Sequence, residues 1–170
     1  ELGFAETQKR GYFTIKSSVF QPYQTWFNLL PSLRALKQAR YFGRAYDESD
    51  VNYARRSLRG TVTLDYRAYE LTQLQIPHTF FIYVENPNRV AEDLIGNGFS
   101  EGKKGRVAIL PMEGDFNNEI QRLYLDCLAS GGRSVLDAIA LEILYGNQLS
   151  VRGEFSTELV MKVKEDLPPK

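Results

Sequence analysis

Side chains able to carry out nucleophilic catalysis are few in this 170-residue chain. His78 is its single histidine, so any serine–histidine or cysteine–histidine arrangement would depend on that one residue. It stands between Pro77 and an aromatic segment, where a structural or surface role is the simpler interpretation. Cys127, the single cysteine, lies on the apolar stripe of an expected helix, where cysteine usually acts as an inert small hydrophobic residue. We therefore predict that the chain is not an enzyme.

The sequence also contains few motifs that would indicate a metal site or a phosphate-binding loop. The sequence contains no Cys-x-x-Cys or His-x-x-x-His spacing, which argues against the common zinc sites. Residues 102–105, Gly-Lys-Lys-Gly, lack the spacing of a phosphate loop and predict a solvated turn. A nuclease of restriction-endonuclease type would need a Glu-x-Lys on a strand, whereas Glu85 is followed by Asn86-Pro87. The carboxylates that leave this alternative open are Asp65, Glu70, Glu85, Glu113 and Asp115. We predict neither a metal nor another cofactor.

Basic side chains are a stronger signal, because they are concentrated between residues 34 and 59. The segment Arg40-Tyr41-Phe42-Gly43-Arg44 alternates aromatic and basic residues, as many nucleic-acid-binding surfaces do. A solvated helix face paired with neighbouring acidic residues explains the pattern equally well. The chain has 21 basic and 21 acidic residues, so only a local patch can attract DNA. The predicted DNA contacts are Arg40, Arg44, Arg55, Arg56 and Arg59.

Composition indicates a globular protein, with 43% hydrophobic and 25% charged residues. This length suits one domain, or one domain with a small appendage. No apolar run approaches the roughly 20 residues of a membrane-spanning helix. A single cysteine excludes an intrachain disulfide and fits a reducing compartment, so a cytoplasmic location is expected.

The expected elements alternate between strands and helices. Short β-prone runs at residues 2–5 and 11–16 predict a hairpin, and a helix follows that opens near Pro22 and that Pro31 should kink or break. A short basic helix is expected at residues 51–58, capped by Ser49 or Asp50. Residues 78–85 form the clearest strand, and both of its faces are apolar, which predicts a central position.

The second half of the chain supplies further elements. Asn86 and Pro87 predict a capped helix that ends near Gly96, followed by a strand at residues 106–110 and a last strand or short helix at residues 159–164. This order predicts an α+β or α/β fold with a central mixed sheet flanked by helices. The proposed division is a wing-like hairpin with its linking helix at residues 1–40 and the main domain at residues 41–170.

Residues 120–145 show the spacing of two helices joined by Gly131-Gly132. Arg122 and Asp126 lie four residues apart and can form a pair on the helix surface. Ser134, with Asp137 three residues later, is a candidate cap for the second helix.

This region resembles the C-terminal domain of the AbiEi-type antitoxins of type IV toxin–antitoxin (abortive infection) systems. The resemblance covers about residues 61–145 and centres on Tyr124-Leu125-Asp126-Cys127 and Gly131-Gly132-Arg133. It departs from the family at Cys127, where an aliphatic residue is usual. Members of the family repress their operon through an N-terminal winged helix-turn-helix, to whose wing the hairpin at residues 2–16 is similar, while the C-terminal domain counteracts a nucleotidyltransferase-like toxin.

The resemblance implies an antitoxin-like transcriptional regulator domain that binds a toxin partner and assists binding to duplex DNA. It implies that Tyr124, Asp126 and Arg133 help to present the partner surface, whereas a surface ion pair and a helix-start cation explain Asp126 and Arg133 equally well. The recognition helix expected before the wing is missing from this chain, which predicts DNA binding without sequence preference. The alternatives are the nuclease considered above and a purely structural interaction domain.

Overall fold

The structure, a computed structural model, describes residues 5–9, 12–15, 17–113 and 117–169, with side chains from residue 27 onward. Its centre is a five-stranded sheet in the order β4 (Thr61–Thr63), β5 (Phe80–Val84), β7 (Val107–Pro111), β3 (Arg40–Gly43) and β6 (Ser100–Glu101). The pair β5–β7 is parallel and the other neighbours are antiparallel. This mixed sheet confirms the predicted α+β class.

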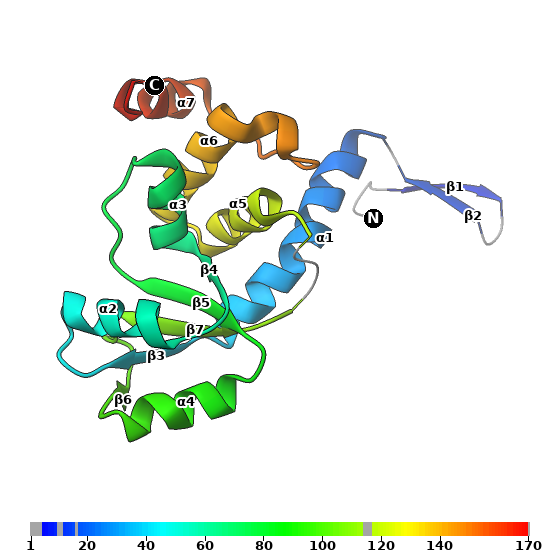
Figure 1. Ribbon diagram of the computed structural model, residues 1–170. Coiled ribbons are helices and arrows are strands. Elements are labelled where there is room, and N and C mark those ends of the chain that lie inside the picture. The colour runs from blue at the N-terminus through cyan, green and yellow to red at the C-terminus, as the bar shows by residue number, and fades with distance from the viewer. Residues whose placement is uncertain (1–4, 10–11, 16, 114–116, 170) are drawn as a thin grey trace.

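Helices cover both faces of the sheet (Figure 1). One face packs against α2 (Glu48–Ser57) and α4 (Pro87–Gly96). The other packs against α3 (Leu64–Thr72), α5 (Glu119–Ser130), α6 (Ser134–Tyr145) and the second half of α1 (Ser17–Lys37). The short 3-10 turn η1 (Gly146–Gln148) then leads toward α7 (Thr157–Asp166), which packs on α6. Within the described residues, no helix has the length and apolar character needed to cross a membrane.

Alternation along β5 explains why two cores form. Phe80, Ile82 and Val84 point to the α2–α4 side, while Phe81 and Tyr83 point to the side of α3 and α5. All five residues are buried, so the prediction of a central strand with both faces covered is confirmed.

A hairpin is present near the N-terminus as predicted, but its first strand covers residues 5–9 instead of 2–5, and residues 2–4 lie outside the described part of the chain. Strands β1 (Ala5–Lys9) and β2 (Tyr12–Ile15) pair antiparallel and lie beyond the first turns of α1, away from the sheet (Figure 1). The expectation that Pro31 breaks the following helix is wrong, because α1 continues through Pro22 and Pro31 to Lys37. Its Ala35 is buried in the same core as α5, and this packing compensates for the backbone hydrogen bond that a proline removes. The second half of α1 thus belongs to the main body.

Several element boundaries follow the predicted signals and others do not. Asn86 caps α4 by accepting a hydrogen bond from the Arg89 backbone, and Pro87 occupies the first turn as predicted. The cap of α2 is Asp47, which accepts from the backbone N–H of Ser49, so neither predicted cap is correct. The last element is the helix α7, and Ser134 does not cap α6, because the preceding residue already has helical dihedral angles.

Candidate nucleic-acid interface

The candidate site lies where the parallel strands β5 and β7 end. From that edge α4 leads to one face of the sheet, whereas α5, the next helix after β7, packs on the opposite face. In open sheets, ligands usually bind outside the carboxyl ends of two neighbouring parallel strands whose following helices pack on opposite faces of the sheet. Strands β3 and β4 begin at the same edge, since Arg40 lies opposite Ile109 and Thr61 opposite Tyr83.

A cavity of about 500 Å³ opens at this edge, between residues 57–60 and the first turn of α4. Val84, Val90 and Met112 give it an apolar floor, and its charged lining residues are Arg59, Glu85, Arg89 and Asp93. Gly60 fixes the course of the chain here, because it has a φ of +155° and a Cβ at this position would lie 2.0 Å from the carbonyl oxygen of Tyr83. The backbone therefore approaches β5 closely and places Arg59 at the cavity.

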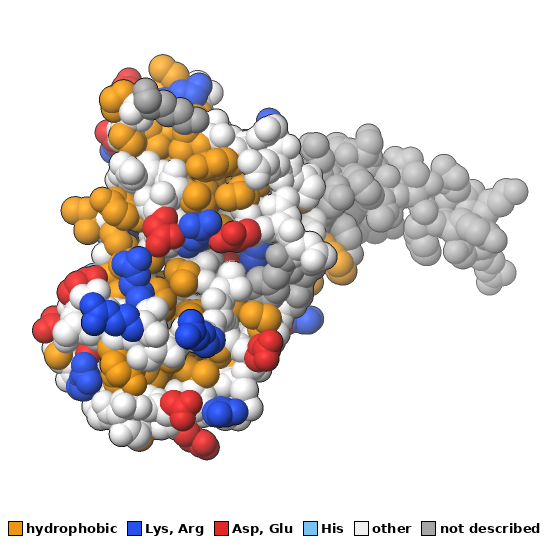
Figure 2. Space-filling view, in the orientation of Figure 1, with side chains coloured by type: hydrophobic (Ala, Val, Ile, Leu, Met, Phe, Trp, Pro, Cys, Tyr) orange, Lys and Arg blue, Asp and Glu red, His pale blue; other side chains and the backbone are white. Residues whose placement is uncertain are grey.

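Two exposed arginines line this cavity and a third precedes it in the chain, and we call them the arginine surface: Arg59, Arg89 and Arg56. Arg56 lies in the last turn of α2, three residues before Arg59, and Arg59 and Arg89 line the same cavity. None of the three forms an ion pair with another described residue. Figure 2 shows Lys and Arg side chains gathered on the left of the molecule, around α2. These guanidinium groups are free to bind an anionic partner.

Arg40 and Arg44, also predicted DNA contacts, are engaged within the protein. Arg40 makes a two-point contact with Glu101, at 2.8 Å from Nε and 2.7 Å from Nη2, and reaches Asn88 at 3.3 Å. The guanidinium of Arg44 stacks 5.1 Å from the centre of the Phe99 ring and lies 3.8 Å from Asp50. The prediction missed β3, whose Phe42 is fully buried, so the alternation of aromatic and basic residues does not form an exposed surface.

Arg55 takes an intermediate position. It is half exposed, lies 3.6 Å from Glu70 and covers the ring of Tyr66 at 6.0 Å. Exposed pairs of this kind contribute about 0–1 kcal/mol, so Arg55 can exchange its partner for a phosphate at small cost. Burial, followed in importance by the hydrogen bond to Glu48, raises the pKa of Tyr66 to about 12. The Tyr66 hydroxyl therefore stays neutral beside the arginines.

The predicted partner residues Tyr124 and Asp126 lie in the interior, which corrects the expectation of a surface position. Asp126 is fully buried and accepts hydrogen bonds from Thr63 at 2.7 Å, from Tyr83 at 2.8 Å and from Arg122 at 3.1 Å. Burial raises the pKa of the Asp126 carboxyl, and Arg122 opposes this rise. The Arg122–Asp126 pair therefore exists as predicted, but in the core rather than on the surface.

Tyr124 has a structural role as well. Its buried hydroxyl donates to Glu142 at 2.8 Å and accepts from the backbone N–H of Gly153 at 2.5 Å. These bonds hold the segment between η1 and α7 against α5. In this fold neither Tyr124 nor Asp126 can touch a partner directly.

Arg133 is the one predicted partner residue that is exposed. Its Nε donates to Gln75 at 3.1 Å, its Nη2 donates to the carbonyl of Ile76 at 3.0 Å, and Gln75 returns a bond to the Arg133 carbonyl. Gly131 and Gly132 have φ values of +67° and +53°, which confirms the predicted glycine turn between the two helices. The turn is thereby attached to the loop after α3.

The residues considered for catalysis do not come together. His78 is exposed and donates its backbone N–H to Asp65, while Cys127 is buried, which raises the pKa of its thiol well above the usual value. In the described part of the chain, no group of three metal-ligating side chains is present. Asp115, the last predicted carboxylate, lies outside the described residues. Residues 102–105 form the expected turn, with Lys103 and Lys104 exposed.

Asp137 should make the stability of the protein depend on pH. Burial raises the pKa of Asp137 from 3.8 to about 6, and its Oδ1 is buried with no hydrogen-bond partner among the described residues. Because the folded state favours the protonated form, the stabilisation is complete below about pH 4 and is lost as the pH rises through about 6. Asp137→Asn should remove this decline and add about 3 kcal/mol of stability at pH 7.

Urea denaturation of both proteins at several pH values measures the effect. Asp93→Asn, an exchange of the same type at an exposed position of α4, serves as the control and should leave the pH profile unchanged. Equal slopes for Asp137→Asn and the wild-type chain would show that Asp137 does not titrate in this range.

Sequence reasoning missed Arg89, Thr63 and Tyr83. Arg89 follows a correctly predicted cap, but its position beside Arg59 depends on how β4 and β5 pair. For Tyr83, the sequence signal was its hydroxyl group, a single polar atom on an otherwise apolar strand that needs a hydrogen-bond partner when buried. Comparison of the chain with protein-family models, with curated proteins and with solved structures gave no match.

Proposed function

We propose that this chain is a non-catalytic, antitoxin-like regulator domain that contacts duplex DNA through the arginine surface and binds a nucleotidyltransferase-like toxin as its partner. The observation that carries the DNA contact is the group of three exposed arginines that have no ionic partner among the described residues. Guanidinium groups in such positions bind phosphates with two-point hydrogen bonds. No base-reading element accompanies them in the described residues, so the contact is independent of sequence.

The arrangement of elements supports the partner function only through the resemblance noted above. The strand β5, the capped helix α4, the strand β7 and the pair α5–α6 with its Gly131-Gly132 turn occupy the segments that carry that resemblance. The partner surface must consist of exposed residues, which excludes Tyr124 and Asp126 and keeps Arg133. No observation favours the nuclease alternative.

Binding of a random duplex to the full chain at low salt tests the DNA contact. Arg56→Ala with Arg59→Ala should weaken binding about tenfold or more, because two phosphate contacts and their counterion release are lost. Lys103→Ala with Lys104→Ala removes the same charge from the turn before β7, at the opposite end of the sheet, and should have little effect. Equal losses for both double variants would indicate only general charge attraction.

Co-expression tests the partner function. The chain should relieve the growth arrest caused by a nucleotidyltransferase-like toxin encoded beside it and should purify with that toxin. Failure of both, with the chain folded, would contradict the antitoxin role and leave the DNA contact to be judged separately.

A further inference from the structure

The cavity between residues 57–60 and the first turn of α4 has the size and the apolar lining of a small-ligand site. Its volume of about 500 Å³ lies within the range of roughly 300–1,000 Å³ that is usual for such sites. Among its lining residues, Val84 is buried, Leu58 and Val90 are half-buried, and Met112 is 38% exposed. A flat apolar group that covered these residues would remove their exposed carbon atoms from water, which is favourable.

Charged groups of both signs line the same cavity and do not neutralise one another. Arg59 and Arg89 supply two guanidinium groups, and Glu85 and Asp93 supply two carboxylates. All four residues are exposed, and none of them forms an ion pair with another described residue. A ligand that complements this lining therefore carries an anionic group for the arginines and N–H donors for the carboxylates.

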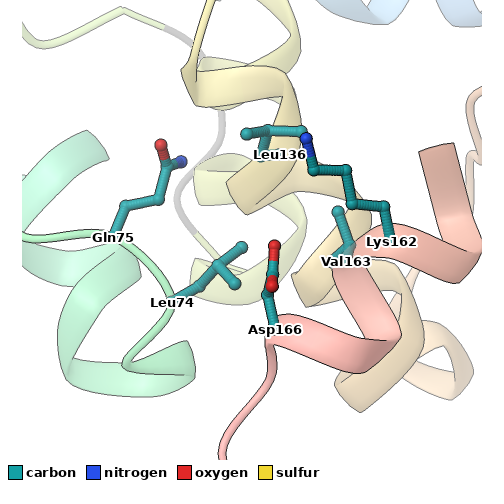
Figure 3. Close-up of a pocket in the computed structure, with 6 residues that line it drawn as sticks. All are labelled: Leu74, Gln75, Leu136, Lys162, Val163 and Asp166. Carbon is teal, nitrogen blue, oxygen red and sulfur yellow. The ribbon is translucent and has the colours of Figure 1, made fainter.

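A second hollow, the groove between the segment after α3, helix α6 and helix α7, lacks this combination (Figure 3). It measures about 300 Å³, and its charged lining residues are one lysine, Lys162, and one aspartate, Asp166. A single ammonium group is a point charge and does not make the two-point contact with a phosphate that a guanidinium makes. The charged residues of this groove are thus suitable positions for control variants.

We propose that the cavity at the arginine surface binds a guanine mononucleotide. Arg59 and Arg89 hold its phosphate, and the base lies on the apolar residues. Glu85 and Asp93 provide the carboxylates that accept from the N–H donors of the base. Guanine is preferred because its ring N–H and its amino group are adjacent and meet one carboxylate together, whereas each of the other bases places an acceptor beside its donor. Because the cavity is open to solvent, the Kd is about 10–100 µM.

This inference goes beyond the proposed DNA contact, because it requires the cavity and not the binding of a duplex. The two carboxylates distinguish them, since they repel the phosphates of a duplex but accept from a guanine base. Glu85→Gln combined with Asp93→Asn should therefore bind duplex at least as tightly as the wild-type chain does. The same variant should lose its preference for guanine.

Isothermal titration calorimetry of the full chain with GMP at low salt tests the phosphate contact. The wild-type chain should bind GMP with a Kd of about 10–100 µM and should bind guanosine, which lacks the phosphate, about tenfold more weakly. Arg89→Ala should weaken the binding of GMP about tenfold and leave the affinity for guanosine unchanged. Lys162→Ala removes the same charge from the groove of Figure 3 and should bind GMP as the wild type does.

Base selectivity gives the sharper result. The wild-type chain should bind GMP about tenfold more tightly than AMP, and Glu85→Gln with Asp93→Asn should reduce this ratio to about twofold or less. Glu165→Gln with Asp166→Asn makes the same exchange at exposed positions of α7 and should keep the wild-type ratio. A wild-type chain that does not bind GMP, equal affinities for GMP and AMP, or a preference that survives the exchange of both cavity carboxylates would each overturn the proposal.

Discussion

Replacing Asp126 by alanine should lower the free energy of unfolding by about 3–5 kcal/mol, since the exchange leaves the buried Arg122 without its carboxylate. The Arg122 side chain is only 6% exposed and keeps its bond to the Glu113 carbonyl, but the Tyr83 and Thr63 hydroxyls lose their acceptor. Each orphaned polar group in the core adds to the loss. Urea denaturation measures the change.

Two further variants separate charge burial from general damage. Asp93→Ala, at an exposed position of α4, should change stability by less than about 0.5 kcal/mol. Arg122→Met combined with Asp126→Leu removes both charges and should recover the part of the loss that comes from the unpaired guanidinium, while the Tyr83 and Thr63 hydroxyls still lack their acceptor. A loss below about 1 kcal/mol for Asp126→Ala would mean that the carboxylate is not buried in an ion pair.

Gly105→Ala should be nearly as damaging, with a loss of about 3 kcal/mol. A Cβ at Gly105 would lie 2.3 Å from the carbonyl carbon of Phe42 and 2.5 Å from its nitrogen, so the backbone of β3 would have to move. Gly102, at the other end of the same turn, has open space around its would-be Cβ and provides the matched control. Thermal unfolding of Gly105→Ala and Gly102→Ala measures the difference, and the melting temperature of Gly105→Ala should be clearly lower. Equal melting temperatures would contradict the close approach of β3 to this turn.

Local signals predicted the elements that depend on local chemistry. A short run that is apolar on both faces identified β5, and the Asn86-Pro87 pair identified the start of α4. Gly131 and Gly132 predicted the turn between α5 and α6, because both residues have positive φ values, which glycine adopts without strain. The prediction of a helix break at Pro31 was wrong because the energetic cost of proline inside the helix is offset by packing of α1 against α5, which is distant in the sequence.

The candidate site depended on contacts between distant residues. Arg40 is neutralised by Glu101, 61 positions later, whereas Arg56 and Arg59 meet no such partner in the described residues. Asp126 was expected on the surface because its spacing from Arg122 fits an exposed pair, but Tyr83, 43 positions earlier, supplies the hydroxyl that draws it inside. The spacing of Arg122 and Asp126 predicts that they pair but does not predict that the pair is buried. Both the arginine surface and the buried network around Asp126 could therefore be identified only from the structure.

The salt dependence of duplex binding tests the arginine surface most directly. For the wild-type chain, the logarithm of the association constant should fall linearly with the logarithm of salt concentration between about 50 and 200 mM. Arg56→Ala with Arg59→Ala should reduce the steepness of that line by about 1.8, because each lost phosphate contact accounts for about 0.9. The lysine control should keep the wild-type slope. Identical slopes for the arginine variant and the wild type, or no binding at the lowest salt, would contradict the proposed DNA contact.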